Sequence, residues 1–484
     1  MFRFFNTTVL GPLLPLVLTI AGLYLLLRCR FFLFRRPMNL LRTMLGERGK
    51  RFAAFKAACV ALSGTLGVGN IAGVAAAIAV GGAGSVFWMW VFGVLAMVIK
   101  YAEVVTAMSY KKNGKGGASY YLEQGLHRRA LGVFFAVLIL FSSFSVGNIV
   151  QSSAASEALY SCFSVPKWLT GIFFCLITVC LVNGGYTRVA RFSSIVIPLL
   201  SLGYVVLSVA ILMVNKSHIL TVLNAIFTDA FAPDALLGGS GGFFLGRAVR
   251  FGAARGILSN EAGCGTATYA HASADSDPMR QGLWGMFEVF IDTIVLCSLT
   301  GFVVLTAFPN VLPSSEGMTL AIDAYSAFGD WGGNFIAVSS AIYALAAVVC
   351  WSYYGTENLA YLGGKDKSRR LYLAVYSATG FVGAIFAPDF VWELTDFSIA
   401  VMALVNSICL CFLARVPADA TRNFLEKTTV SDRISKFGKR SRRLGIGQGR
   451  NINRGVTRPK RLKRLTVTAS GDIKNIGDNS TGCR

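Results

Sequence analysis

Charged residues and histidines are scarce in this sequence. Of its 484 residues only 14% are charged and 3 are histidines, whereas 54% are hydrophobic. Soluble domains carry about 25% charged residues, so this composition excludes an ordinary soluble globular protein. The chain is predicted instead to be an all-α, polytopic membrane protein.

Patterns typical of disulfide frameworks, metal sites and catalytic centres are also missing. Eleven cysteines are present, but they form no C-x-x-C pair, and most lie inside apolar runs such as FFCLITVCLV. Such cysteines are typical of small buried hydrophobic residues. His127, His218 and His271 are scattered, and no nucleophile and base stand at helical spacing, so neither a metal site nor an enzyme is predicted.

Long apolar runs are abundant. A hydrocarbon core of roughly 30 Å needs about 20 apolar residues in a helix, and about eleven segments meet this requirement. They are 9–27, 57–81, 85–109, 130–158, 167–183, 189–213, an interrupted one within 219–256, 282–308, 335–359, 370–387 and 391–414. The first is interpreted as a retained helix and not a cleaved signal, because four arginines follow it between Arg28 and Arg36.

Basic residues are nearly absent from every second loop. They gather between the first two spans and in the loops 110–129, near 188, 247–280 and 361–370, whereas the loop 309–334 has none. Lys and Arg favour the cytoplasmic side. The N-terminus is therefore predicted to face out of a bacterial inner membrane, and the C-terminus to lie in the cytoplasm.

The C-terminal tail, 416–484, is predicted to be basic and disordered. From Arg415 to Arg484 there are 18 Lys and Arg residues against 5 acidic ones, with no apolar periodicity. Anionic lipid headgroups are the nearest partner for such a segment, and solvated charge without a partner is the alternative. The lack of interleaved aromatic residues gives no support to a nucleic-acid partner.

Two predicted spans contain glycine clusters that weaken a helix. LSGTLGVGNIAGVAAAIAVGG, 62–82, holds Gly67, Gly69 and Asn70 within four residues, and LLGGSGGFFLGRAVRFG, 236–252, is richer still in glycine. Unwound backbone at membrane depth is tolerated where it lines a polar cavity, and its free N–H and C=O groups suit a carboxylate and Na⁺. Close helix packing is the alternative explanation of the same glycines.

Broken helices at corresponding positions of two halves are typical of an inverted-repeat secondary transporter. The predicted organisation is therefore a 5+5 helix core, 57–415, preceded by one extra transmembrane helix and a basic connector in 1–56. A channel or passive carrier remains the alternative, and only a coupled transporter would accumulate its substrate.

Six motifs make a more specific prediction. They are LSGTLGVGNIAGVAAAIAVGGAGSVFWMWVFGVLAMVIKYAE, GGASYYLEQGL, SVGNIVQSSAASEAL, ARGILSNEAGCGTATYAHASA, RQGLWGMFEVFIDTIVLCSLTG and CWSYYGTENLAYL. In this order they resemble the alanine/glycine:cation symporter family, over roughly residues 10–415. The resemblance implies a leucine-transporter-like fold and sodium-coupled symport of alanine or glycine, D or L, by alternating access. A proton-coupled or uncoupled carrier of small amino acids is the alternative.

The resemblance also implies a substrate site, in which backbone N–H groups hold the substrate carboxylate, an amide faces the substrate and aromatic rings wall the pocket. These residues are Gly67, Val68, Gly69, Asn70, Gln151, Phe251 and Trp351. An interhelical hydrogen bond is the other explanation of a lone glutamine in a span. Ser153, where the family favours Asn, leaves the substrate preference open.

The coupling cation is predicted to bind the backbone carbonyls of Ser63, Gly64 and Gly67, since Na⁺ prefers oxygen ligands. The family usually adds a Ser/Thr pair about four residues before the tryptophan. This sequence has Ala346 and Ala347 there. H⁺ is therefore kept as the alternative coupling ion.

Three polar features allow more than one interpretation. Asp292, near the middle of its span, is either a coupling acid or a structural partner of another helix. Lys100 and Glu103 are explained by snorkelling or by a mutual pair. The segment 259–274, SNEAGCGTATYAHASA, is either a gating loop whose glycines absorb backbone changes or a packed connector.

Overall fold

The computed structural model of the chain is helical throughout the part that it describes. The described residues are 2–32, 37–45, 48–112, 114–182, 185–232, 246–309, 313–386 and 389–426. By contacts the chain divides into residues 1–428 and 429–484, and all described residues belong to the first unit. Within them the regular structure is α-helix and π-helix, beside one isolated bridge between Lys112 and Lys115, so the all-α prediction is confirmed.

The helices of the N-terminal part, with π-helical segments marked η, are α1 (Phe2–Phe5), η1 (Asn6–Leu10), α2 (Gly11–Arg28), α4 (Pro37–Leu45), α5 (Arg48–Thr65), η2 (Gly69–Gly73), α6 (Val74–Gly81), α7 (Gly84–Ser109), α8 (Ala118–Leu126), α9 (Arg129–Phe144), η3 (Ser145–Ile149), α10 (Val150–Phe163), α11 (Lys167–Val182), α12 (Gly185–Val214) and α13 (Lys216–Ala230). The helices of the C-terminal part are α15 (Arg247–Asn260), α16 (Ala267–Ala272), α17 (Pro278–Val289), η6 (Phe290–Cys297), α18 (Ser298–Ala307), α19 (Gly317–Ser326), α20 (Asp330–Tyr361), α21 (Asp366–Ile385) and α22 (Asp389–Phe412).

Seven of the described helical stretches are long and apolar enough to cross a membrane: Thr8–Arg28, Gly84–Ser109, Arg129–Phe163, Gly185–Val214, Pro278–Ala307, Asp330–Tyr361 and Phe390–Phe412. The pair Phe52–Thr65 and Gly69–Gly81, bent by 54°, makes an eighth if it is counted as one span. The fifth and tenth predicted spans are the helices α11 and α21, and α11 is a shorter apolar helix. A count of eleven spans stays a prediction.

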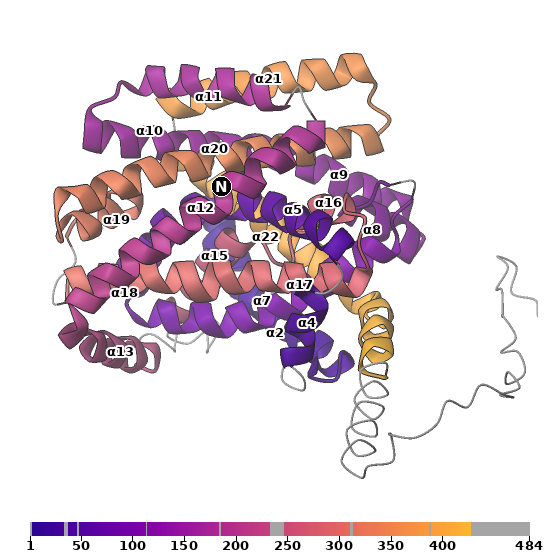
Figure 1. The fold of residues 1–484 in the computed structure, drawn as a ribbon, viewed down its shortest axis with the longest axis horizontal. Helices are drawn as coiled ribbons and strands as arrows, with labels where there is room; N and C mark the ends of the chain where they lie inside the picture. The colour runs from indigo at the N-terminus through magenta and orange to yellow at the C-terminus, as the bar shows by residue number, and fades with distance from the viewer. Residues whose placement is uncertain are drawn as a thin grey trace, which may run out of the picture. The chain divides into compact units, whose positions relative to one another are not determined.

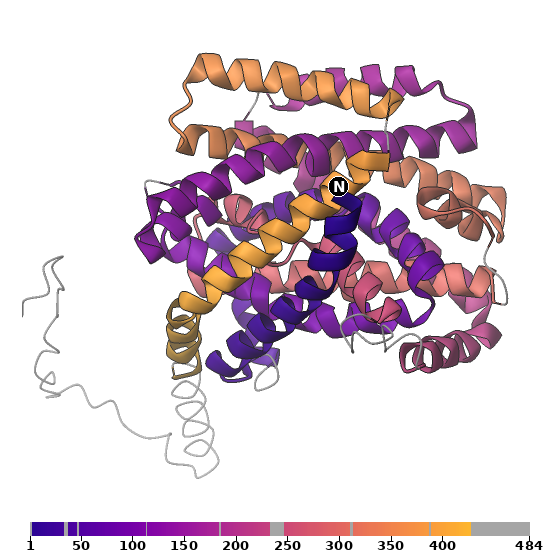
Figure 2. The ribbon, with the colours of Figure 1, turned by 180° about the vertical axis from the view of Figure 1, so that it is seen from behind.

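The described helices pack in layers around the bent pair α5 and η2–α6. At one edge of this unit α11 packs on α21, and α10 packs on α20 beside them (Figure 1). Further in, α7 packs on both α15 and α17. The N-terminal helix α2 lies beside α22, as the view from behind shows (Figure 2). The bent pair α5 and η2–α6 is enclosed by this packing, since α5 contacts α12 and α20 while η2 contacts α15 and α19.

Most of the second predicted break lies outside the described residues. Residues 236–245 lie outside the described residues, and Arg247–Gly252 belong to the regular helix α15. Gly252 serves close packing there, because an added Cβ would lie 2.7 Å from the Ser85 carbonyl oxygen and from Trp88 Cβ on α7. Glycine inside a helix is therefore explained at this position by helix contact and not by unwinding.

The described chain breaks further on, between α15 and α16. Glu261, Gly263 and Gly265 have φ angles of 50°, 86° and 72°. Such left-handed residues cannot continue a right-handed helix, and two of the three are glycines, which adopt this conformation without steric cost. The segment that was interpreted as a gating loop or a connector, 259–274, therefore contains a second broken helix.

Two other expectations change at the same time. Arg247, Arg250 and Arg255, counted above in a basic loop, lie on helix α15, where Arg255 forms an ion pair with Asp396 of α22 at 2.9 Å. Residues 415–426 of the expected tail are helical, so any unstructured segment begins beyond them. The remainder of the tail lies outside the described residues.

Candidate functional site

The first break brings its backbone against Gln151. The chain bends at Leu66 and Gly67, between α5 and η2. Val68 N donates to Gln151 Oε1 at 3.4 Å, and Gln151 Nε2 donates to the Val146 carbonyl at 3.3 Å. A Cβ on Gly67 would lie 2.7 Å from Gln151 Oε1, so glycine is required for this approach. The structure thus places Gly67, Val68 and Gln151 together, as the sequence predicts.

The first break also touches the second. A Cβ on Gly69 would lie 2.8 Å from Ser259 Cα, in the last turn of α15. Backbone atoms approach this closely only where one residue lacks a side chain. The two explanations of the glycines, unwinding and close packing, therefore both apply within four residues.

Asp292 of η6 connects the two breaks. One of its carboxylate oxygens accepts from Asn70 Nδ2 at 2.7 Å, and the other accepts from Ser259 Oγ at 2.7 Å and from Thr293 Oγ1 at 2.9 Å. Asn70 Oδ1 in turn accepts from Gly67 N at 3.3 Å. A buried carboxylate with three donors is well satisfied. Of the two interpretations of Asp292, the structure supports the structural partner.

Three π-helical segments carry or precede the polar residues described above. η2 carries Asn70, η3 precedes Gln151, and η6 carries Asp292, while η2 contacts both η6 and α15. π-helical turns are rare and occur frequently at functional sites. The extra residue per turn rotates side chains out of the regular helical register, which no apolar periodicity in the sequence reveals.

A small cavity of about 10 Å³ lies between the two breaks, with room for about one water molecule. Its walls come from both breaks, from α10 with the turn before it, and from α22: Gly64, Thr65, Val68, Gly69, Val146, Val150, Gln151, Leu258, Glu261, Trp392 and Thr395. Polar and apolar side chains share these walls, and Glu261 alone among them carries an ionisable group.

The two predicted aromatic walls lie elsewhere. Phe251 lies against Gly81 and lines a separate cavity of about 120 Å³, together with Arg255 and Asp396. Trp351 is fully buried on α20, packed against Gly147 of η3; it does not line the small cavity but interacts with Glu261, which does. The structure therefore gathers the predicted backbone and amide groups, with Trp351 behind the cavity wall and Phe251 apart from it.

The backbone carbonyls of the predicted cation site all come from the C-terminal end of α5 and from the first break. Ser63 Oγ donates to the Val60 carbonyl at 2.7 Å, and Gly64 borders the cavity. Ala346 and Ala347 are fully buried on α20, and Ala346 belongs to the same hydrophobic cluster as Leu66 and Val68. A Cβ on Gly64 would meet Cys350 Sγ and Tyr354 Oη of α20.

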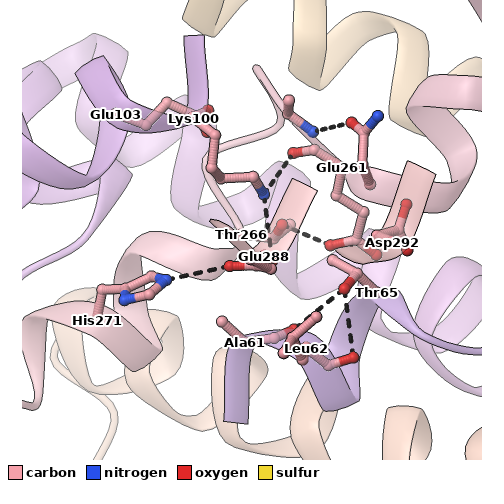
Figure 3. Close-up of polar contacts among 12 residues, drawn as sticks. Ala61, Leu62, Thr65, Lys100, Glu103, Glu261, Thr266, His271, Glu288 and Asp292 are labelled. Carbon is pink, nitrogen blue, oxygen red and sulfur yellow. Dashed lines mark hydrogen bonds and ion pairs between the residues drawn. The ribbon is translucent and has the colours of Figure 1, made fainter. Parts of the chain in front are cut away.

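A group of buried charges adjoins the second break: Lys100 and Glu103 of α7, Glu261, His271 of α16 and Glu288 of α17. We refer to these five residues as the charge cluster. Figure 3 shows Lys100 Nζ between Glu288 and the Glu261 carbonyl, at 3.6 Å and 3.3 Å. His271 Nε2 lies 3.1 Å from the other oxygen of Glu288.

Sequence reasoning missed Glu261, Glu288 and His271 as members of one site. Lys100 and Glu103 are fully buried, so snorkelling does not explain them. A mutual pair does not either, because Lys100 pairs with Glu288 and Glu103 accepts from Gly265 N at 2.8 Å. The available signal was the glutamate in SNEAGCG, which is followed two and four residues later by glycines.

Comparison with known proteins identifies the family. The family model described as the sodium:alanine symporter family matches residues 1–437. The sodium/alanine symporter AgcS of Methanococcus maripaludis is 35% identical over 440 residues, which are 87% of this chain and 96% of that protein. The chain belongs to the sodium:alanine symporter family. It is thus a multi-pass integral membrane transporter for small amino acids, and this family is not an enzyme class.

Other similarities agree with this assignment. The amino-acid carrier protein AlsT of Bacillus subtilis is 31% identical over 415 residues, covering 84% of this transporter and 88% of AlsT. Among solved structures, a manganese transporter of Eremococcus coleocola matches with a TM-score of 0.50 at 11% identity, over 75% of this chain and 78% of that one. At this identity the likeness concerns the fold alone.

Proposed function

We propose that this transporter couples the uptake of alanine or glycine to the movement of a monovalent cation by alternating access. The observation that carries the proposal is the meeting of the two helix breaks at one small cavity with both polar and apolar walls, where Val68 N–H is directed at Gln151. Broken helix ends at such a place suit a zwitterion and its coupling ion. The close valine and leucine walls favour a short side chain.

The backbone of the first break would hold the substrate carboxylate. In the structure the N–H groups of Gly67 and Val68 are directed at neutral amide oxygens, at 3.3 Å and 3.4 Å. A carboxylate would form shorter and stronger bonds with the same donors. Gln151 Oε1 would then be released to accept from the substrate ammonium.

Na⁺ is the first candidate for the coupling ion, with the Ser63, Gly64 and Gly67 carbonyls as neutral ligands. The methyl groups of Ala346 and Ala347 leave H⁺ as the second candidate. An amino acid does not fit into a cavity of about 10 Å³, so binding requires the surrounding helices to separate. Asp292, which binds both breaks, would keep them together as they move.

The proposed architecture is a ten-helix core with two inverted repeats behind α2. The bent pair α5 and η2–α6 would be the first helix of one repeat, and α15 with α16 the first helix of the other. We propose an extracellular N-terminus, which labelling of single engineered cysteines at Phe4 and at Thr428 in sealed cells would test.

The decisive experiment is uptake of labelled alanine and glycine into proteoliposomes under imposed Na⁺ or H⁺ gradients. Gln151→Ala is expected to reduce uptake strongly, and Gln124→Ala on α8 is the matched control. Accumulation that collapses with the ion gradient supports a symporter. Equilibration without accumulation supports an uncoupled carrier, and no transport of either amino acid refutes the substrate assignment.

A further inference from the structure

The position of Glu261 sets it apart from the other buried acids. It is the first residue of the second break, has a left-handed backbone, and is one of the residues that line the small cavity. Glu261 therefore belongs to the charge cluster and also borders the cavity. The inference below rests on the proposed function, because it concerns the ion that drives transport.

The charge cluster has too few cations for its acids. Three carboxylates face one ammonium, Lys100, and none of the five residues is more than 3% exposed. Gln281 Nε2 lies 2.6 Å from His271 Nδ1 and donates to the Ala54 carbonyl at 3.3 Å. Three ionised carboxylates outnumber the cations of the cluster whichever charge His271 carries, and an uncompensated buried charge is unfavourable.

Two of the three carboxylates are compensated within the protein. Glu288 has Lys100 at 3.6 Å and His271 at 3.1 Å. Glu103 Oε1 accepts from Gly265 N at 2.8 Å and from Asn406 Nδ2 at 2.6 Å. Hydrogen bonds from two donors stabilise the ionised form of a carboxylate.

Glu261 is the least compensated of the three. Among the described residues its carboxylate accepts from Thr266 Oγ1 at 2.5 Å and interacts with the Trp351 indole and, at longer range, with Lys100, but it forms no ion pair. Lys100 Nζ donates to the backbone carbonyl of Glu261 instead, as Figure 3 shows. A carboxylate that faces a cavity and lacks a cation is a site where a cation from solution binds most favourably.

A second observation points to the same ligand. Tyr354 Oη is fully buried and interacts with the thiol of Cys350, a weak hydrogen-bond partner. It lies beside Gly64, since a Cβ there would be 3.2 Å away, and Gly64 borders the same cavity as Glu261. Glu103 Oε2 is buried without a hydrogen-bond partner among the described residues. Weakly or incompletely satisfied buried oxygens of this kind are expected next to a site for a cation or a proton.

We propose that Glu261 is the charged ligand of the coupling cation. The neutral oxygens at the C-terminal end of α5 and Tyr354 Oη complete its surroundings, in place of the hydroxyl pair that Ala346 and Ala347 remove. Occupancy of Glu261 neutralises one excess charge beside the substrate cavity. The cation and the substrate are then coupled because they share the walls of one cavity.

The ionisable groups that interact with Glu261 are Lys100 of α7, Cys264 of the break, Glu288 of α17, and Cys350 and Tyr354 of α20. A further shell consists of Glu103 of α7, His271 of α16 and Asp292 of η6, which interact with Glu288, and Tyr121 of α8, which interacts with Glu103. Lys100 is the one group in this set that carries a positive charge when His271 is neutral. Either a proton or Na⁺ bound to Glu261 thus neutralises one excess negative charge of the cluster.

The first test measures cation binding on the purified full-length protein in detergent. Binding of radioactive Na⁺ is measured at fixed pH, and binding of H⁺ is measured by the pH dependence of the melting temperature in Na⁺-free buffer. Glu261→Gln is expected to weaken Na⁺ binding at least about tenfold, or to flatten the pH dependence. Glu157→Gln, which changes an exposed glutamate of α10, is the matched control.

The second test separates the ion site from the substrate site. Counterflow exchange of labelled alanine requires binding and translocation but no ion gradient. Glu261→Gln is expected to retain exchange and to lose accumulation driven by the imposed gradient. Loss of Na⁺-driven accumulation assigns the ion as Na⁺, and loss of H⁺-driven accumulation assigns it as H⁺. Accumulation equal to that of the wild-type protein overturns the proposal.

Two further results keep the outcome decisive. If Glu261→Gln does not fold, Tyr354→Phe keeps all the charges and is expected to weaken cation dependence about fivefold, with Tyr160→Phe as its exposed control. An unchanged cation dependence in Tyr354→Phe then overturns the proposal. If the wild-type protein exchanges neither alanine nor glycine, the proposed substrate fails, while the binding measurements still judge Glu261.

Discussion

Three glycines in the first broken helix face three different neighbours and therefore predict three different outcomes on replacement by alanine. A Cβ on Gly67 would lie 2.7 Å from Gln151 Oε1, the end of a flexible side chain. A Cβ on Gly69 would lie 2.8 Å from Ser259 Cα, which moves only with the backbone of α15. A Cβ on Gly73 would meet the Leu258 Cδ2 methyl at 3.9 Å, an ordinary contact distance.

The magnitudes follow from these distances. Gly69→Ala forces two backbones apart, and overpacking of this kind costs about 1–3 kcal/mol, against which alanine regains about 1 kcal/mol of helix propensity. Gly67→Ala displaces Gln151 and loses its hydrogen bond from Val68, a loss of about 0.5–1.5 kcal/mol. Gly73→Ala keeps the propensity gain, so it is expected to stabilise the protein by about 0.5–1 kcal/mol.

Thermal unfolding of the purified variants and alanine uptake in proteoliposomes check these expectations together. The melting temperatures are expected to fall in the order Gly73→Ala, wild type, Gly67→Ala and Gly69→Ala. Gly67→Ala is expected to lose most of its uptake despite a small change in stability, because it moves Gln151. Equal melting temperatures for all three variants would refute the described packing, and normal uptake by Gly67→Ala would remove Gln151 from the site.

Three other predictions concern contacts that hold helices together. Asp292→Asn replaces one carboxylate oxygen, which accepts a hydrogen bond, by an NH₂ group that cannot accept one. The variant is expected to have a free energy of unfolding about 2 kcal/mol lower and to show reduced uptake. A double-mutant cycle of Arg255 and Asp396 is expected to give a coupling of about 0.2–1 kcal/mol, because the pair is partly exposed, and exchange of the two charges should recover it. Tyr101→Phe removes the 2.8 Å contact with Thr421 and is expected to make residues 415–426 more susceptible to proteolysis, while a protection pattern like that of the wild-type protein would contradict the described docking.

The parts of the fold that depend on one residue after another could be predicted from the sequence. Apolar runs of sufficient length gave the all-α class and eight of the predicted spans, because a membrane helix satisfies its own backbone. The first break was also predictable, since Gly67, Gly69 and Asn70 fall together in an apolar run. Gln151 lies against the first break, where the family resemblance implied a glutamine.

The break between α15 and α16 was not predicted, for a physical reason. Glycine content alone cannot distinguish a helix that must approach a neighbour from a helix that must unwind, and Gly252 does the former. This break is marked by Glu261, Gly263 and Gly265, which take left-handed conformations in one short segment. Its polarity made it resemble a loop, although it lies in the middle of the packed helices.

The charge cluster could not be predicted because its members are far apart in the sequence. Its members come from α7, the second break, α16 and α17, and no spacing along the chain relates Lys100 to Glu288. Each looks like an ordinary residue near a helix end when it is considered alone. Only their common burial shows that the acids outnumber the cations and that one of them needs an external partner.

The two breaks are therefore coupled by more than proximity. Asp292 binds Asn70 of the first break and Ser259 in the last turn of α15, just before the second break, so a change in the backbone near either break alters a hydrogen bond of Asp292. Glu261 follows Ser259 by two residues, and the N–H groups proposed for the substrate precede Asn70 by two or three. A cation that fixes the second break thereby biases the first toward one geometry, and reciprocity of binding free energies requires the substrate to favour the cation in return.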